Sequence, residues 1–170
     1  MTHPHLARRP PSEGNRSTFT WAAWMSRSEY SQWQRIFTAA DSPGDNLTTN
    51  ASVQFAGDSY SNTFRFFDTM DHSDSHNTDN TDVYSRQRVK DCGGWYHFVV
   101  AVDTTSPNAD DRNKIFINGH KVKDFANSES YGAQGQKSAI NASDLLHLIG
   151  VRIPSGLSLI HISEPTRPVT

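Results

Sequence analysis

The amino-acid sequence predicts an all-β protein built from antiparallel strands. Two observations lead to this prediction. Short apolar segments alternate with polar residues in a two-residue period, and turn-forming residues separate the segments at short intervals. No long segment shows the 3.6-residue period of an amphipathic helix. Short strands at this spacing are typical of an antiparallel β-sandwich or barrel.

The N-terminal half is expected to contain an arm and four strands. Residues 1–15 hold three prolines and no periodic pattern, so they are interpreted as a linker or arm. In Ser17–Met25, Phe19 and Trp21 fall on one face and Thr18 and Thr20 on the other, as in a half-buried strand. Three shorter strands are expected at Trp33–Thr38, Val53–Phe55 and Phe64–Phe67.

The C-terminal half contains the clearest strand signals. Trp95–Asp103 is aromatic and β-branched and is bounded by glycines and a Ser-Pro-Asn turn, so it is expected to be a central strand. Asn118-Gly119 lies between two strand-like segments and predicts a tight hairpin, because both residues tolerate positive φ. A last apolar segment, Leu145–Val151, is expected to be a further strand.

Composition and charge exclude several classes of function. A length of 170 residues is typical of one domain. The net charge of −2 argues against a nucleic-acid partner, since such proteins usually carry a basic surface. No apolar segment approaches the roughly 18 residues of a membrane span, and no secretory signal precedes Arg16. The single Cys92 predicts no intramolecular disulfide.

Three segments, in order, resemble a known family. Arg16–Met25 is an aromatic-rich strand that ends near a Trp, Trp95–Asp103 begins with a Trp-x-His pattern, and Lys114–Val122 contains the Asn-Gly hairpin. Together they resemble the laminin G-like domains of the concanavalin A-like lectin/glucanase superfamily, in the variant found in bacteriophage tail and fibre proteins. The resemblance implies a jelly-roll β-sandwich over residues 16–156. The family's closing strand does not follow Gly150, so the sandwich is expected to lack its C-terminal strand or strands.

The resemblance implies a noncatalytic recognition module rather than an enzyme. Its expected ligand is a glycan or another cell-surface polymer, and its expected location is a virion tail fibre or another surface that faces the exterior. Neighbouring fibre chains are the other expected partners. Two alternatives remain open: a structural spacer or assembly domain of a fibre that binds no ligand, and a glycoside hydrolase.

A glycoside hydrolase is disfavoured by the acidic residues. Retaining glycoside hydrolases need two carboxyl groups about 5 Å apart. In hydrolases with the jelly-roll fold, these groups resemble a single strand pattern of closely spaced Glu and Asp residues. The glutamates before the C-terminal segment are Glu13, Glu29 and Glu129, which do not have that spacing. No Gly-x-Ser-x-Gly motif indicates a serine nucleophile either. We therefore expect no catalytic residue.

A polar segment, Asp68–Asp82, is the strongest candidate for a ligand site. It is rich in Asp and Asn and is expected to be a long loop, where such side chains can bind a sugar beside an aromatic ring. We expect no resident cofactor or metal, although Ca²⁺, which prefers such oxygens, could bind near Asp68, Asp71 and Asp74. The expected ligand-binding residues are Tyr60, Asp71, Asp74, Asp79, Asp82 and Tyr84.

The C-terminal segment differs in origin from the rest. Leu157–Arg167 resembles, residue by residue, the in-frame translation of a transposon-type sequencing adapter. Leu157–Thr170 is therefore interpreted as a non-native tail, which evolution did not select to pack against the sandwich. Its apolar start, Leu157–Ile162, could still be drawn onto an exposed strand edge.

Deletion of Leu157–Thr170 tests the interpretation of the tail. A tail that was never selected to pack contributes nothing to stability, so thermal melts of the full and the shortened chain should coincide. A loss of several kcal/mol in the free energy of unfolding, the scale expected for removing packed core residues, would contradict the adapter interpretation.

Overall fold

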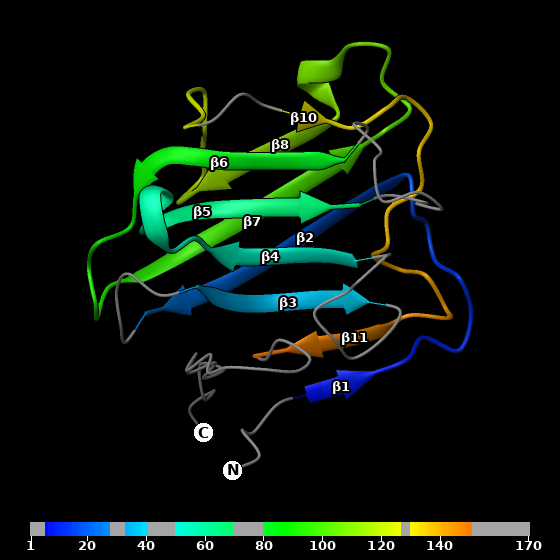
Figure 1. The fold of residues 1–170 in the computed structure, drawn as a ribbon, viewed down its shortest axis with the longest axis horizontal. Helices are drawn as coiled ribbons and strands as arrows, with labels where there is room; N and C mark the ends of the chain where they lie inside the picture. The colour runs from blue at the N-terminus through cyan, green and yellow to red at the C-terminus, as the bar shows by residue number, and fades with distance from the viewer. Residues whose placement is uncertain (1–5, 28–32, 41–49, 70–79, 127–129, 151–170) are drawn as a thin grey trace, which may run out of the picture.

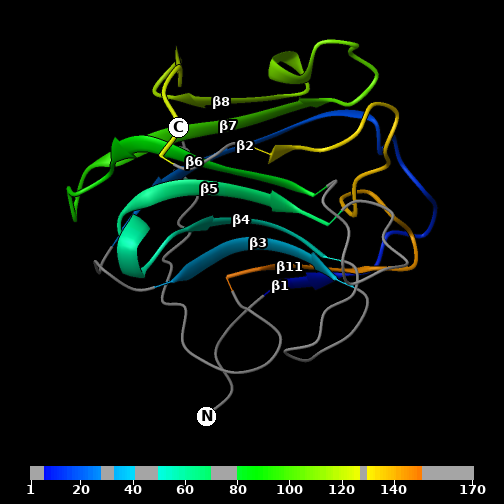
Figure 2. The ribbon, with the colours of Figure 1, turned by 45° about the horizontal axis from the view of Figure 1, so that its top comes forward.

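The computed structural model describes residues 6–27, 33–40, 50–69, 80–126 and 130–150 of the chain. These residues form two antiparallel sheets packed face to face, so the predicted antiparallel β-sandwich is confirmed (Figure 1). Figure 2 shows the two layers, with β2, β7 and β8 on one side and β3, β4 and β5 on the other. Within the described residues, no helix has the length and apolar character needed to cross a membrane.

The two sheets differ in size. The larger sheet has seven described strands, in the spatial order β1 (Leu6–Arg8), β11 (Leu146–Ile149), β3 (Gln34–Ala40), β4 (Asn50–Phe55), β5 (Thr63–Asp68), β6 (Thr81–Arg88) and β10 (Ser130–Tyr131). The smaller sheet has four, in the order β2 (Thr18–Ser26), β7 (Trp95–Asp103), β8 (Asn113–Ile117) and β9 (His120–Lys121). Two short 3₁₀ helices, η1 (Asp58–Tyr60) and η2 (Ala109–Asp111), lie in the connections.

Aromatic rings from both sheets meet in the core. Phe64 of β5 stacks on Phe98 of β7 with ring centroids 4.6 Å apart. Phe55 of β4 contacts the same Phe98 ring edge-on at 5.4 Å. All three side chains are buried, and burying one such ring contributes about 1.5–3 kcal/mol to folding. These contacts join the two sheets.

The predicted hairpin is confirmed. β8 and β9 pair with Phe116 opposite Lys121 and Ile117 opposite His120. Asn118 and Gly119 form the turn with φ of 51° and 79°, the positive values that a tight type I′ turn requires. The Asn118 side chain also ties the turn to β7, because its Oδ1 accepts a hydrogen bond from the His97 backbone N–H at 2.8 Å.

The polar segment after β5 differs from its prediction. It was expected to form a loop from Asp68 to Asp82, but Asp68 ends β5 and Asp82 lies inside β6. Only Val83 and Tyr84 are large apolar residues in β6, so its local pattern is weak. The strand forms because it pairs with β5 and buries Thr81 and Val83, whereas its last three residues are exposed.

The arm also differs from its prediction. Leu6–Arg8 lies within the expected arm of residues 1–15, yet it forms β1 and pairs with β11, with Leu6 opposite Ile149. A strand of three residues is too short for its alternation to be visible in the sequence. Its place is set by the backbone groups that β11 offers at the edge of the sheet.

One flank of the sandwich is open in the described part of the chain. β2 is the edge strand of the smaller sheet and pairs there only with β7. Its inward residues Phe19, Trp21 and Ala23 are only partly buried against the core. The tail from Leu157 to Thr170 lies outside the described residues, so the expected absence of a closing strand and the non-native origin of the tail stay predictions.

Substitutions on adjacent residues of β7 test the central core. Phe98→Ala should lower the free energy of unfolding by about 3–5 kcal/mol, because it leaves a cavity between two phenylalanine rings. Val99→Ala is the matched control: its side chain points to the opposite face and is only partly buried, so its effect should be about 1 kcal/mol or less. Chemical denaturation measures both. Equal losses for the two variants would contradict this assignment of core and outer faces.

Candidate functional site

The outer face of the larger sheet gathers polar and aromatic side chains. Phe64 and Phe66 of β5 point into the core, so Arg65 and Phe67 point outward between them. In the neighbouring strand, Tyr84 lies opposite Arg65 and Asp82 lies opposite Phe67. The strand pairing therefore places these four side chains next to one another on one surface.

Arg65 is the centre of this group. Its Nε and Nη2 donate hydrogen bonds to the two carboxylate oxygens of Asp82, at 2.7 and 2.9 Å. This two-point contact fixes the plane of the guanidinium. Three aromatic rings surround the same group: Phe67 at 4.6 Å, Tyr84 at 4.8 Å and Trp33 at 5.6 Å from its central carbon. An arginine held in this way cannot easily change its rotamer.

Two further contacts extend the aromatic surface. The Tyr60 ring, from η1, packs on Tyr84 with centroids 4.6 Å apart. Trp33 lies over Gly57, where an added Cβ would come within 2.8 Å of its ring, so glycine is required for this approach. Trp33 remains 39% exposed. We call Trp33, Tyr60, Arg65, Phe67, Asp82 and Tyr84 the Arg65 cluster.

Burial and charge act on the Tyr84 hydroxyl in opposite directions. Burial raises the pKa of Tyr84 above its ordinary value, the positive charge of Arg65 lowers it, and Asp82 and Tyr60 raise it further. The net pKa is raised, so the hydroxyl stays protonated at neutral pH.

A row of polar side chains lies beside the Arg65 cluster on the same face. Thr38 of β3 lies opposite Ser52 of β4, and Gln54 of β4 lies opposite Arg65. Thr38, Ser52 and Gln54 are buried, and their side-chain polar atoms have no hydrogen-bond partner among the described residues. Buried polar groups normally have partners, but these three side chains are at most 1% exposed and so are not part of the accessible surface.

The structure brings three of the predicted ligand residues together. Tyr60, Asp82 and Tyr84 all belong to the Arg65 cluster, although Asp82 comes from a strand rather than from the expected loop. Asp71, Asp74 and Asp79 lie outside the described residues, so their expected role stays a prediction.

Asp68 is not available as expected for Ca²⁺. Its carboxylate is completely buried. It accepts hydrogen bonds from the Ser138 hydroxyl and from the Ala139 backbone N–H, so it joins β5 to the segment before β11. Among the described residues, no group of three or more potential metal ligands comes together.

The sequence did not indicate Arg65, Trp33 or the polar row. Arg65 and Asp82 are 17 residues apart, and only the pairing of β5 with β6 joins them. The one available signal was the alternation of Phe64-Arg65-Phe66, which marks Arg65 as outward-facing once that segment is taken as a strand.

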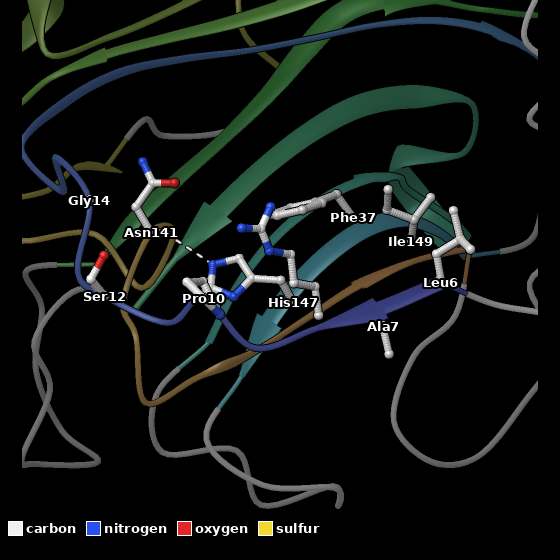
Figure 3. A pocket seen from close by; sticks show the side chains of 10 residues that line it. Leu6, Ala7, Pro10, Ser12, Gly14, Phe37, Asn141, His147 and Ile149 are labelled. Carbon is white, nitrogen blue, oxygen red and sulfur yellow. Dashed lines mark hydrogen bonds between the residues drawn. The ribbon is translucent and has the colours of Figure 1, made fainter.

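A separate cavity lies at the flank formed by β1 and β11. Its volume is about 490 Å³, and Leu6, Phe37, Ile149 and Pro10 line it together with His147 and Asn141 (Figure 3). Most of the lining is apolar. This chemistry suits an apolar group better than the hydroxyl-rich surface of a sugar.

His147 is the polar centre of this cavity. The Asn141 backbone N–H donates to its Nε2 at 3.0 Å (Figure 3). Its Nδ1 lies 3.1 Å from the Leu145 carbonyl oxygen. This arrangement fits the neutral imidazole with its proton on Nδ1. Burial lowers the pKa of His147, the Leu145 carbonyl raises it in part, and the charge of Arg8 lowers it further.

Comparisons with known proteins agree with the fold. A family model described as the concanavalin A-like lectin/glucanases superfamily matches residues 5–146. A search of curated proteins finds no match. Among solved structures, the native heptameric SAP-like pentraxin from Limulus polyphemus is similar, with a TM-score of 0.51 and 16% sequence identity. The likeness covers 90% of this chain and 61% of that chain, and at this identity it shows the fold only.

The lowered pKa of His147 predicts a pH dependence of stability. In the unfolded chain the imidazole titrates near its ordinary pKa of 6.5. Below that pH the unfolded state binds a proton that the native state resists, so the free energy of unfolding should fall as pH decreases. His147→Gln, which keeps a donor and an acceptor but does not titrate, should reduce the difference in stability between pH 7.5 and pH 5.5. An unchanged difference would show that other groups cause it.

Proposed function

Because the chain belongs to the concanavalin A-like lectin/glucanase superfamily, we propose that it is a noncatalytic recognition module that binds a glycan or another surface polymer. The proposed site is the outer face of the larger sheet, at the Arg65 cluster. The observation that carries this proposal is the arrangement of aromatic rings around the Arg65–Asp82 pair.

The chemistry of the Arg65 cluster matches that of a sugar. A pyranose ring has an apolar face of C–H groups, which can pack on an aromatic ring such as Trp33, and hydroxyl groups at its edge. The hydroxyls can donate to the Asp82 carboxylate, whose side chain is partly exposed. Arg65 holds the Asp82 carboxylate in one orientation. A rigid site of this kind loses little entropy on binding.

The proposal is for binding without catalysis. Retaining and inverting glycosidases both use two carboxyl groups. In the described strands of the larger sheet, Asp82 is the only carboxylate on the outer face, and Arg65 holds it in a two-point contact.

We place the module on a surface that faces the exterior, such as a bacteriophage tail fibre, where neighbouring fibre chains would be its other partners. The motive is the resemblance of Arg16–Met25, Trp95–Asp103 and Lys114–Val122 to the domains of such proteins. Ca²⁺ forms no part of the proposed site, so chelation should leave binding unchanged.

A glycan array tests the proposal with matched variants. Tyr60→Ala removes the ring that packs on Tyr84, and Asp82→Asn removes the acceptor charge while keeping the shape. Each should weaken binding about tenfold, equivalent to about 1.4 kcal/mol. Gln87→Ala, at an exposed position of the same strand, is the control and should bind as the unmodified chain does, with or without EDTA.

Absence of binding to every glycan on the array would contradict the proposal and favour the structural spacer. Release of reducing sugar from a bound glycan would instead favour a glycoside hydrolase. Thermal melts of each variant separate loss of a contact from loss of the fold.

A further inference from the structure

The outer face of the smaller sheet is a second surface with binding chemistry. In β2 the outward residues Thr18, Thr20, Ala22 and Trp24 are all exposed, while the intervening residues are partly buried. No described element packs over this face: the described strands form only the two sheets, and the larger one lies on the opposite side (Figure 2).

Aromatic side chains cluster at one end of this face. Trp24 lies opposite His97 of β7, with ring centroids 5.1 Å apart and planes inclined at 31°. Trp95 lies two residues before His97 and therefore on the same face. Trp24 is 59% exposed and Trp95 is 46% exposed. Two tryptophans this exposed and this close together are a feature of binding surfaces rather than of an inert one.

A hollow with charged groups at its margin, here called the polar hollow, lies at the other end of the same face. It has a volume of about 340 Å³, and most of its lining surface is apolar. Its lining residues are Thr18, Phe19, Thr20, Ala101, Val102, Asp103, Asp111 and Lys114. The Lys114 ammonium lies 3.0 Å from the Asp111 carboxylate and keeps the pKa of that carboxyl below its ordinary value, so the group stays ionised at neutral pH. The hollow thus presents hydroxyl, carboxylate and ammonium groups within one small volume.

Smaller side chains lie between the two ends of the face. Ala22 lies opposite Val99 and Thr20 opposite Ala101. Trp24 lies six residues after Thr18 in β2, a distance of about 20 Å along the strand. This length accommodates several sugar residues in an extended chain.

The charges on this face cancel. Two carboxylates, Asp103 and Asp111, accompany two lysines, Lys114 and Lys121, the latter placed on this face by its pairing with Phe116. A balanced face neither attracts nor repels a charged polymer strongly, so it suits an uncharged one.

We propose that the outer face of the smaller sheet binds a neutral polysaccharide chain that lies along β2 and β7. Sugar rings pack on Trp24 and Trp95, and hydroxyl groups of the same chain enter the polar hollow. The site goes beyond the function proposed above, because it lies on the opposite face of the sandwich and shares no residue with the Arg65 cluster. Occupation of both faces would let one domain hold two polymer strands.

A protein partner fits these features less well. The strongest contacts of protein interfaces cluster at the centre of the contact area and are ringed by residues that exclude water. Here the tryptophans lie at one end, and smaller side chains separate them from the polar hollow. That distribution matches a long, narrow ligand better than a compact one.

Affinity electrophoresis of the full chain in gels that contain a neutral β-glucan, a mannan or a galactan tests the proposal. Trp24→Ala and Trp95→Ala should each weaken binding to the retained polysaccharide about tenfold, the scale of a lost aromatic contact. Trp24→Phe, which keeps an aromatic face, should retain most of the binding. Lys90→Ala, an exposed change outside the strands, should have no effect.

The outcomes separate this site from the Arg65 cluster. Loss of retention in the tryptophan variants but not in Tyr60→Ala supports a site on the smaller sheet. Loss in Tyr60→Ala alone, unchanged retention of a Trp24→Ala/Trp95→Ala double variant, or no retention of the unmodified chain by any of the three polymers would overturn it. A change from dimer to monomer in the double variant, measured by sedimentation, would also overturn it and identify a protein interface.

Discussion

Phe64 of the larger sheet and Phe98 of the smaller sheet stack across the middle of the sandwich with their ring centroids 4.6 Å apart. Removing these apolar rings from water is favourable, so each strand is oriented with this side chain in the core. Because successive residues of a strand point to opposite faces, that constraint also decides what faces outward. Arg65 follows Phe64 and His97 precedes Phe98, so each lies on one of the two outer surfaces.

The two outer faces differ in how firmly their outward side chains are held. On the larger sheet the outward groups are held in fixed contacts: Asp82 meets Arg65 at two points, and Tyr84 packs on Tyr60. On the smaller sheet Trp24 and Trp95 remain exposed, and the His97 ring packs on Trp24. The first surface is therefore held in place by contacts among its own side chains to a greater extent than the second.

The open flank follows from the unequal size of the sheets. β11 and β1 extend the larger sheet, whereas β2 ends the smaller one among the described residues. Phe37 and Ile149 therefore border a cavity instead of a packed partner strand, and His147 is held there as a neutral group by two backbone contacts.

The sequence by itself determined the fold class, the hairpin at Asn118-Gly119 and the superfamily, because these depend on local alternation, turn chemistry and short motifs. It also indicated Tyr60, Asp82 and Tyr84, which belong to one cluster. It could not indicate that Arg65 joins them, since the 17 residues between Arg65 and Asp82 are bridged only by strand pairing. β6 itself has too few apolar residues to be recognised from its pattern, and it forms only because β5 offers it an edge and the core accepts Val83. The conformation of a single strand or turn can thus be predicted from its own residues. Which residues share a surface depends instead on the register between strands, which only the tertiary structure decides.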